Sequence, residues 1–222
     1  MVLGSTPLWF GAVSALMRGD TVGVAMMGTP AAFLVFCAGT YLFTTRVGKF
    51  RVWDELLAEL RGDERVLDVG CGRGAVLLLA AERLTTGKAV GIDLWSTTDQ
   101  SGNALAATQR NALAEGVSEK VELHTGDMRK LPFADGEFDV IVSSLAIHNV
   151  PDAAGRAQAV KEIARVLKPG GRVMLADFKD VKNYAKTLRE AGLSELKVRG
   201  LGIRFWYGGP WAGTSLVTAR LD

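Results

Sequence analysis

Three glycines at alternate positions mark the stretch of this sequence that is best suited to hold a ligand. The segment VLDVGCGRG, residues 66–74, contains Gly70, Gly72 and Gly74. It links an apolar run to a helix-forming run, and glycine in that context lets the backbone approach a nucleotide closely. Asp93 ends the next apolar run, 21 residues after Gly72, where a carboxylate can accept hydrogen bonds from ribose hydroxyls. The pattern therefore predicts a cofactor that contains a nucleoside.

The glycines alone leave two classes of cofactor open. Residues 70–75 also fit the G-x-G-x-x-G/A pattern of dinucleotide binding. Asp68, two residues before the first glycine, favours a different class, because its carboxylate would repel a pyrophosphate and suits a cationic amino-acid group. Asp127, with apolar Met128 beside it, follows a later apolar run and is placed to accept a hydrogen bond from an adenine amino group.

His148 is the histidine best placed to act as a base. It lies in SSLAIHNVP, just after the fourth apolar run, and an imidazole ionises near pH ~6.5, which suits proton transfer at neutral pH. A structural role, in which His148 hydrogen-bonds a loop, is an equal alternative. Ser143 and Ser144 precede it and either orient an acceptor or simply leave room for one. His124 lies within an expected strand, and we assign it no role.

The elements that must position these residues alternate between short apolar strands and amphipathic helices from Trp53 onward. This alternation is typical of α/β folds, and strands so apolar are covered on both faces, as in parallel sheets. We expect strands at 65–70, 88–94, 120–127, 138–147, 172–178, 193–201 and 213–221, and helices at 53–61, 74–84, 102–116, 153–171 and 181–192, the fourth of these stopped by Pro-Gly-Gly.

From about Leu60 to Asp222 the chain resembles the class I S-adenosylmethionine-dependent methyltransferase family. The resemblance is carried by VLDVGCGRG, GIDLW, GDMRKLPF, FDVIVSSLAIHNV and VLKPGGRVMLADF, in that order. It implies a Rossmann-like, doubly wound, seven-stranded sheet whose last strand is antiparallel. It also implies S-adenosylmethionine as the cofactor, with its methionine portion at the glycines, its ribose at Asp93, its adenine at Asp127 and Met128, and Leu94 and Trp95 flanking it. The predicted cofactor-binding residues are Asp68, Gly70, Gly72, Gly74, Asp93, Leu94, Trp95, Asp127, Met128 and Ser144, and the predicted catalytic residue is His148.

The N-terminal part of the sequence is far more apolar than the rest. Val2–Met17 and Thr21–Thr45 carry no charge, and the second run reaches the ~20 residues needed to cross a bilayer. We predict an apolar, membrane-associated helical hairpin at 1–45 and a methyltransferase domain at 46–222, held on the cytoplasmic side by the basic residues that follow Thr45. Helices that lie on the membrane or fold over the domain as a lid, and a buried subdomain of a soluble protein, are the alternatives.

Composition and charge exclude several classes of function. The 26 Lys and Arg nearly balance the 24 Asp and Glu, without a like-charged run of the kind that binds nucleic acid, so we expect no nucleic-acid partner. Cys37 and Cys71 lie in differently built segments, so we expect no disulfide. With two histidines and no Cys/His cluster, we expect no metal site. The oligomeric state stays open.

The acceptor is expected to be small or lipophilic. Family members that methylate base amines carry an Asn/Asp-Pro-Pro-Tyr/Phe loop after the fourth strand, whereas this chain has Ser-Ser-Leu-Ala at 143–146. The segment IRFWYGGPWAGTS gathers Phe205, Trp206, Tyr207 and Trp211 into an aromatic wall or a membrane-interface belt. A quinol, isoprenoid, phenol or lipid headgroup would fit, with O-, S- or C-methylation. An NAD(P)-dependent Rossmann oxidoreductase and a non-catalytic, membrane-tethered S-adenosylmethionine-binding protein are the rival functions.

Overall fold

The computed structural model describes residues 2–98 and 101–222, with side chains from Thr6 onward. The chain forms two compact units. One consists of the residues up to Lys49 together with Gly202–Gly213, and the other of Phe50–Leu201 and Thr214–Asp222. The division after Lys49 lies four residues beyond the boundary expected from the sequence, and Gly202–Gly213 was not expected to join the N-terminal helices.

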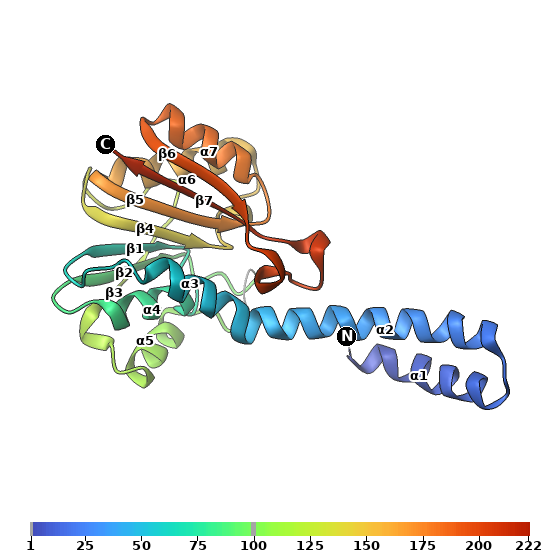
Figure 1. Cartoon of the computed structure of the whole chain (residues 1–222). Helices are drawn as coiled ribbons and strands as arrows, with labels where there is room; N and C mark the ends of the chain where they lie inside the picture. Colours follow the sequence, from blue (N-terminus) through green and yellow to red (C-terminus); the bar gives the residue numbers. More distant parts are fainter. Residues whose placement is uncertain (1, 99–100) are drawn as a thin grey trace. The chain divides into compact units, whose positions relative to one another are not determined.

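The larger unit is built on a seven-stranded sheet with the order β3-β2-β1-β4-β5-β7-β6 (Figure 1). β7 pairs antiparallel with both β5 and β6, whereas the pairs on the other side of β5 are parallel. The predicted fold class, with its antiparallel last strand, is therefore confirmed. The strands are β1 (Arg65–Val69), β2 (Lys88–Asp93), β3 (Val121–Thr125), β4 (Phe138–Ser144), β5 (Leu167–Asp177), β6 (Leu193–Gly200) and β7 (Ser215–Leu221).

Helices connect the parallel strands. α4 and α5 follow β1 and β2, while α6 and α7 follow β4 and β5, so right-handed crossovers running in opposite directions place the two pairs on opposite faces of the sheet. The helices are α3 (Lys49–Leu57), α4 (Ala75–Arg83), α5 (Leu105–Ala114), α6 (Ala153–Val166) and α7 (Val181–Glu190). Three helices differ from expectation by three residues or more at one end: α3 begins at Lys49 and ends at Leu57, α5 begins at Leu105, and α6 ends at Val166 because β5 already contains the Pro-Gly-Gly turn.

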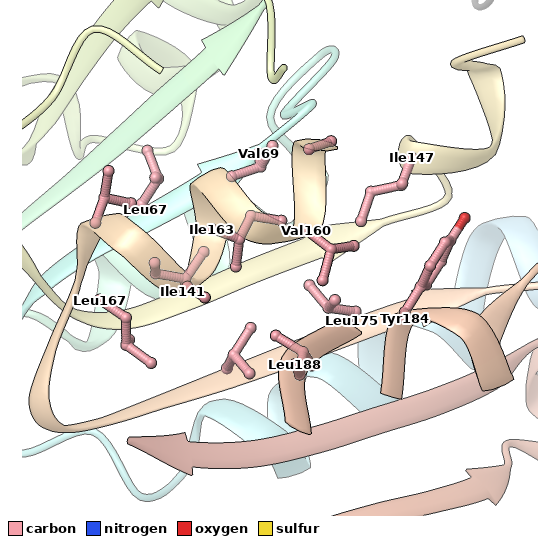
Figure 2. Close-up of a cluster of buried hydrophobic side chains, with 14 of the residues drawn as sticks. Leu67, Val69, Ile141, Ile147, Val160, Ile163, Leu167, Leu175, Tyr184 and Leu188 are labelled. Atoms are coloured by element: carbon pink, nitrogen blue, oxygen red, sulfur yellow. The ribbon is translucent and has the colours of Figure 1, made fainter. Parts of the chain in front are cut away.

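A buried apolar core lies between the sheet and the helices α6 and α7 (Figure 2). Ile163 of α6 and Leu188 of α7 are fully buried, as are Leu67 of β1 and Ile141 of β4. Truncating one such side chain to alanine typically costs about 2–5 kcal/mol. This packing fixes β1, β4 and β5 against one another, and hence fixes the positions of their carboxyl ends.

The smaller unit contains an antiparallel helical hairpin of α1 (Val2–Met17) and α2 (Thr21–Phe43) (Figure 1). Asp20 caps α2 by accepting a hydrogen bond from the Gly23 N–H at 2.9 Å. A π-helix, η1 (Thr44–Gly48), continues α2. Among the described residues, one helix, Thr21–Leu57, is long and apolar enough to cross a membrane, with a mean hydropathy of 1.8 over its most apolar window.

The hairpin buries small side chains and exposes large apolar ones. Ala12, Ala15 and Ala31 are buried, and a Cβ built at Gly11 would collide with the Met27 sulfur, so the two helices approach closely. A soluble helical pair normally has the opposite arrangement, with its large apolar residues inside. The exposed large side chains of the two helices include Trp9, Phe10, Leu16, Met17, Val22, Met26, Phe33, Val35 and Phe36.

Candidate active site

The predicted site residues gather at one edge of the sheet. Asp93 is the last residue of β2 and Ser144 the last of β4, while Asp68 is the last but one of β1. These strands are adjacent and parallel, so their carboxyl ends meet at the same edge. Asp127 and His148 follow the ends of β3 and β4. Ligands of open α/β sheets bind at this edge.

The turn between β1 and α4 requires glycine. Gly70 has a φ of +75°, and a Cβ built there would collide with the Cβ of Ala146. Gly74 has a φ of +90° and is the N-cap residue of α4. The Gly72 N–H donates to Asp93 Oδ2 at 2.8 Å, which ties the turn to the end of β2. The turn therefore presents bare backbone next to two acidic side chains.

Asp68 is a buried acid with an incomplete set of partners. It is 2% exposed, and its Oδ1 atom accepts no hydrogen bond from the residues that the structure describes. Burial, and next the charge of Asp93, raise the pKa of Asp68 to about 7. A cation placed beside Asp68 would be favourable, because its positive charge offsets both the loss of water around the carboxylate and the repulsion from Asp93.

Asp93 organises the loop that follows β2. Its Oδ1 atom accepts hydrogen bonds from the Trp95 N–H at 2.6 Å and from the Asn103 amide at 3.1 Å. The bond from the Trp95 backbone N–H accompanies a φ of +58° at this residue, which is uncommon for a bulky residue. The Trp95 indole N–H donates to Thr125 Oγ1 at 2.8 Å. Leu94, by contrast, is 59% exposed.

Asp127 is paired within the protein. Its carboxylate accepts hydrogen bonds from Arg129, the shortest at 2.6 Å, and this interaction lowers the pKa of Asp127. An adenine amino group would therefore share this carboxylate with Arg129. Met128 lies beside the glycine turn, since its Cε atom is 3.4 Å from a Cβ built at Gly70.

The two serines of β4 are both hydrogen-bonded. Ser143 donates to the Val69 carbonyl at 2.8 Å and is 1% exposed, so it joins β4 to β1 rather than facing an acceptor. Ser144 accepts a hydrogen bond from the Trp53 indole at 3.1 Å. Of the two, the partly exposed Ser144 is the one nearer to solvent.

His148 forms a pair with a carboxylate that the sequence analysis did not single out. Its Nδ1 atom lies 2.8 Å from Asp177 Oδ1, and its backbone N–H donates to Asp177 Oδ2 at 3.0 Å. Asp177 is 2% exposed and ends β5. A carboxylate at Nδ1 selects the tautomer protonated there, which leaves the lone pair of a neutral imidazole on Nε2. Nε2 is then the atom suited to accept a proton.

Further contacts hold this pair in place. The Phe178 ring lies 4.3 Å from the His148 ring, and Tyr184 donates to Asp177 Oδ2 at 3.4 Å. Arg156 donates to the Val150 carbonyl at 2.8 Å and forms an ion pair with Asp180. The loop after β4 is therefore tied to α6 and α7.

Asp177 could have been found by the rule that located Asp93. It is a further acid at the carboxyl end of an apolar strand. Arg156 and Tyr184 carry no comparable signal, because their partners are set by how α6 and α7 pack. His124 packs edge-on against Phe133 at 5.1 Å. Within the described residues there is no group of three His, Cys, Asp or Glu that could hold a metal ion.

Comparison with known proteins identifies the type of domain. Residues 67–175 match the family described as a methyltransferase domain. A 2-phytyl-1,4-beta-naphthoquinone methyltransferase of Arabidopsis thaliana is 37% identical over 136 residues, which is 60% of this chain and 49% of the relative. A ubiquinone/menaquinone biosynthesis C-methyltransferase of Roseobacter denitrificans is 33% identical over 142 residues, 63% of this chain and 53% of the relative. The chain thus spans about half the length of these curated relatives.

A solved structure supports the same fold. The phosphoethanolamine N-methyltransferase 2 of Haemonchus contortus, in complex with S-adenosyl-L-methionine, superimposes with a TM-score of 0.65 at 16% identity. The match covers 82% of this chain and 56% of that one.

Replacing Asp68 by Asn should change how stability depends on pH. Asp68 has a pKa of about 7 in the folded protein against 3.8 normally, so between these values the folded state keeps a proton that the unfolded state has lost. The contribution of Asp68 to the free energy of unfolding is then fully present below pH 3.8 and is lost as the pH rises through about 7. Urea unfolding of the cofactor-free, full-length protein from pH 5 to 8 should show wild type losing stability relative to Asp68→Asn. Parallel curves for the two proteins would contradict the burial of an uncompensated acid.

Proposed function

Because residues 67–175 form a domain of the class I S-adenosylmethionine-dependent methyltransferase family, we propose that this protein methylates a lipophilic, quinol-type acceptor at a membrane. The observation that carries the proposal is the buried Asp68 carboxyl next to Asp93 and the glycine turn, since this arrangement fits a cationic nucleoside. The relatives named as quinone methyltransferases support the acceptor class.

The residues at the sheet edge fit S-adenosylmethionine. When bound, this cofactor supplies an activated methyl group on a positively charged sulfur. The Oδ1 atom of Asp68, which accepts no hydrogen bond from the described residues, would face the cationic amino-acid end, and the backbone around Gly72 would accommodate the methionine portion. Asp93 would accept hydrogen bonds from the ribose hydroxyls, using the lone pairs that are not taken by its hydrogen bonds within the protein. The remaining predicted contacts, with the adenine, the ribose edge or the reacting end, are Leu94, Trp95, Asp127, Met128 and Ser144.

His148 is assigned as the base. A hydroxyl of the acceptor gives its proton to Nε2 of His148, and the imidazolium that forms is stabilised by the Asp177 carboxylate at 2.8 Å. Deprotonation makes the acceptor a stronger nucleophile at oxygen or at the adjacent ring carbon. This nucleophile would take the methyl group that the bound cofactor supplies; where the ring carbon is methylated, that carbon would lose its proton and the oxygen would regain one.

The membrane part of the proposal is supported by the inverted packing of the helical hairpin. Without a hydrophobic driving force between them, membrane helices pack through small residues and direct large apolar ones to lipid. The hairpin follows this pattern, with Ala15 and Ala31 inside and residues such as Phe10 and Met26 outside. Only 17% of the most apolar window of Thr21–Leu57 is buried, which differs from a core helix of a soluble protein. A hairpin in the bilayer would keep the catalytic unit, on its cytoplasmic side, close to a lipophilic acceptor.

The rival functions fit the site less well. A dinucleotide would place a pyrophosphate near Asp68, whose charge disfavours it. A scaffold that only binds S-adenosylmethionine would have no use for a histidine oriented by a buried carboxylate.

The proposed activity predicts methyl transfer within vesicles. Full-length protein in lipid vesicles, supplied with methyl-labelled S-adenosylmethionine and a prenylated naphthoquinol lacking its ring methyl, should move the label into the solvent-extractable lipid fraction. The same quinol in its oxidised form is the matched control and should accept little label, because it lacks the hydroxyl proton and the nucleophilic ring. Cofactor binding without label in any lipid would contradict the proposal and favour a non-catalytic role.

The assignment of His148 predicts a selective loss of turnover. His148→Ala should lower kcat by about 10²–10⁴-fold, the usual contribution of a general base, while calorimetric affinity for S-adenosylmethionine stays near wild type. Asp177→Asn should lower kcat less, and Asn149→Ala, at the exposed neighbouring position, should leave it unchanged. Added imidazole should partly restore turnover to His148→Ala but not to Asp177→Asn. Full turnover of His148→Ala at saturating acceptor would refute the assignment.

A further inference from the structure

The segment Gly202–Gly213, which connects β6 to β7 in the sequence, packs with the N-terminal helices as part of the same compact unit. Arg204 and Trp206, in the first half of the segment, lie against the π-helix η1. Thr44 Oγ1 donates to the Trp206 carbonyl at 3.0 Å, and a Cβ built at Gly48 would collide with the Arg204 carbonyl. The segment is therefore docked closely against the helix rather than merely lying near it.

Two aromatic pairs extend this docking along α2. Tyr207 meets Tyr41 edge-on with ring centroids 6.1 Å apart, and Trp211 stacks on Phe33 at 5.4 Å. From Phe33 to Gly48 the helix advances about 22 Å, at 1.5 Å per residue. The segment thus follows the helix far into its apolar part. Both rings of the Trp211–Phe33 pair remain exposed to solvent, Phe33 to 52% and Trp211 to 63%.

The backbone of the segment is suited to an apolar environment. The Tyr207 N–H donates to the Ala212 carbonyl at 3.2 Å, and the Ala212 N–H donates to the Gly209 carbonyl at 3.1 Å. Pro210 has no N–H to satisfy. Irregular backbone is tolerated at membrane depth only where its polar groups find partners, and the tip of this segment meets much of that requirement internally.

Apart from Arg18 and Asp20, at the turn between α1 and α2, the charged residues of this unit lie around Gly48. The segment carries a single charged residue, Arg204, whose backbone lies against Gly48. Arg46 and Lys49 flank Gly48 in the helix. Basic residues next to an apolar, aromatic surface match the boundary between anionic headgroups and acyl chains.

We infer that Gly202–Gly213 is a lipid-contacting segment whose Trp211 enters the acyl region of a bilayer while Arg46 and Arg204 stay at the level of anionic headgroups. Phe33 lies about 20 Å along the helix from Arg46, which places the Trp211–Phe33 pair below the headgroups when the helix enters the bilayer. The inference rests on the membrane association in the proposed function. It adds a second part of the chain, remote in sequence, to the surface that meets lipid.

Depth-dependent quenching of tryptophan fluorescence tests this inference. Full-length wild type and Trp211→Phe are bound to vesicles of phosphatidylcholine and phosphatidylglycerol whose acyl chains carry bromine. The difference between the two emission spectra reports Trp211 and should lose most of its intensity with brominated acyl chains. Adding Leu113→Trp to Trp211→Phe supplies a control at an exposed position of α5 in the other unit, and this added emission should not be quenched.

The outcomes separate the inference from the proposed function. Binding to vesicles with an unquenched Trp211 difference would overturn the inference and leave membrane association intact. Failure of the full-length protein to bind vesicles at all would overturn both. In either case, label transfer from S-adenosylmethionine to a detergent-dispersed quinol would still report separately on the methyltransferase activity.

Discussion

The Asp68 carboxyl group is taken out of water at the end of β1, beside a second carboxylate and without a hydrogen-bond partner for its Oδ1 atom in the described part of the chain. Burying an acid in this way is unfavourable unless it is protonated or meets a cation. The glycine turn and Asp93, which lie next to Asp68, are consistent with a cationic ligand at this carboxyl group. The glycine turn leaves space for a ligand to approach, and Asp93 braces that turn through Gly72. A cationic nucleoside would relieve the electrostatic cost while filling the space.

The sequence was sufficient for those features that depend on local pattern. Apolar runs and helix formers predicted the alternating fold, and acids at strand ends placed Asp68 and Asp93 at one edge of the sheet. It was insufficient where long-range packing decides. Asp127 pairs with Arg129, and the hydroxyl of Ser143 is used within the sheet. The packing of Gly202–Gly213 against η1 includes a close approach of the Arg204 carbonyl to Gly48, which the sequence pattern around Gly48 does not reveal.

The two units bury opposite kinds of apolar side chain. In the catalytic unit, large apolar side chains such as Ile163 and Leu188 are buried between helices and sheet, so its core holds the strand ends to a fixed geometry. In the helical unit, small residues are inside and large ones outside, so this unit exposes an apolar surface. The proposed reaction, which would bring a water-soluble cofactor to a lipid-soluble acceptor, would use both environments in one chain.

The measurement that most directly tests the central claim is calorimetric titration of the full-length protein with S-adenosylmethionine and, separately, with NAD. The account predicts that S-adenosylmethionine binds and NAD does not, and that Asp93→Ala weakens binding by about 10–100-fold, because each hydrogen bond to a charged group contributes about 1.5–3 kcal/mol. An unchanged affinity in Asp93→Ala, or binding of NAD in place of S-adenosylmethionine, would contradict it.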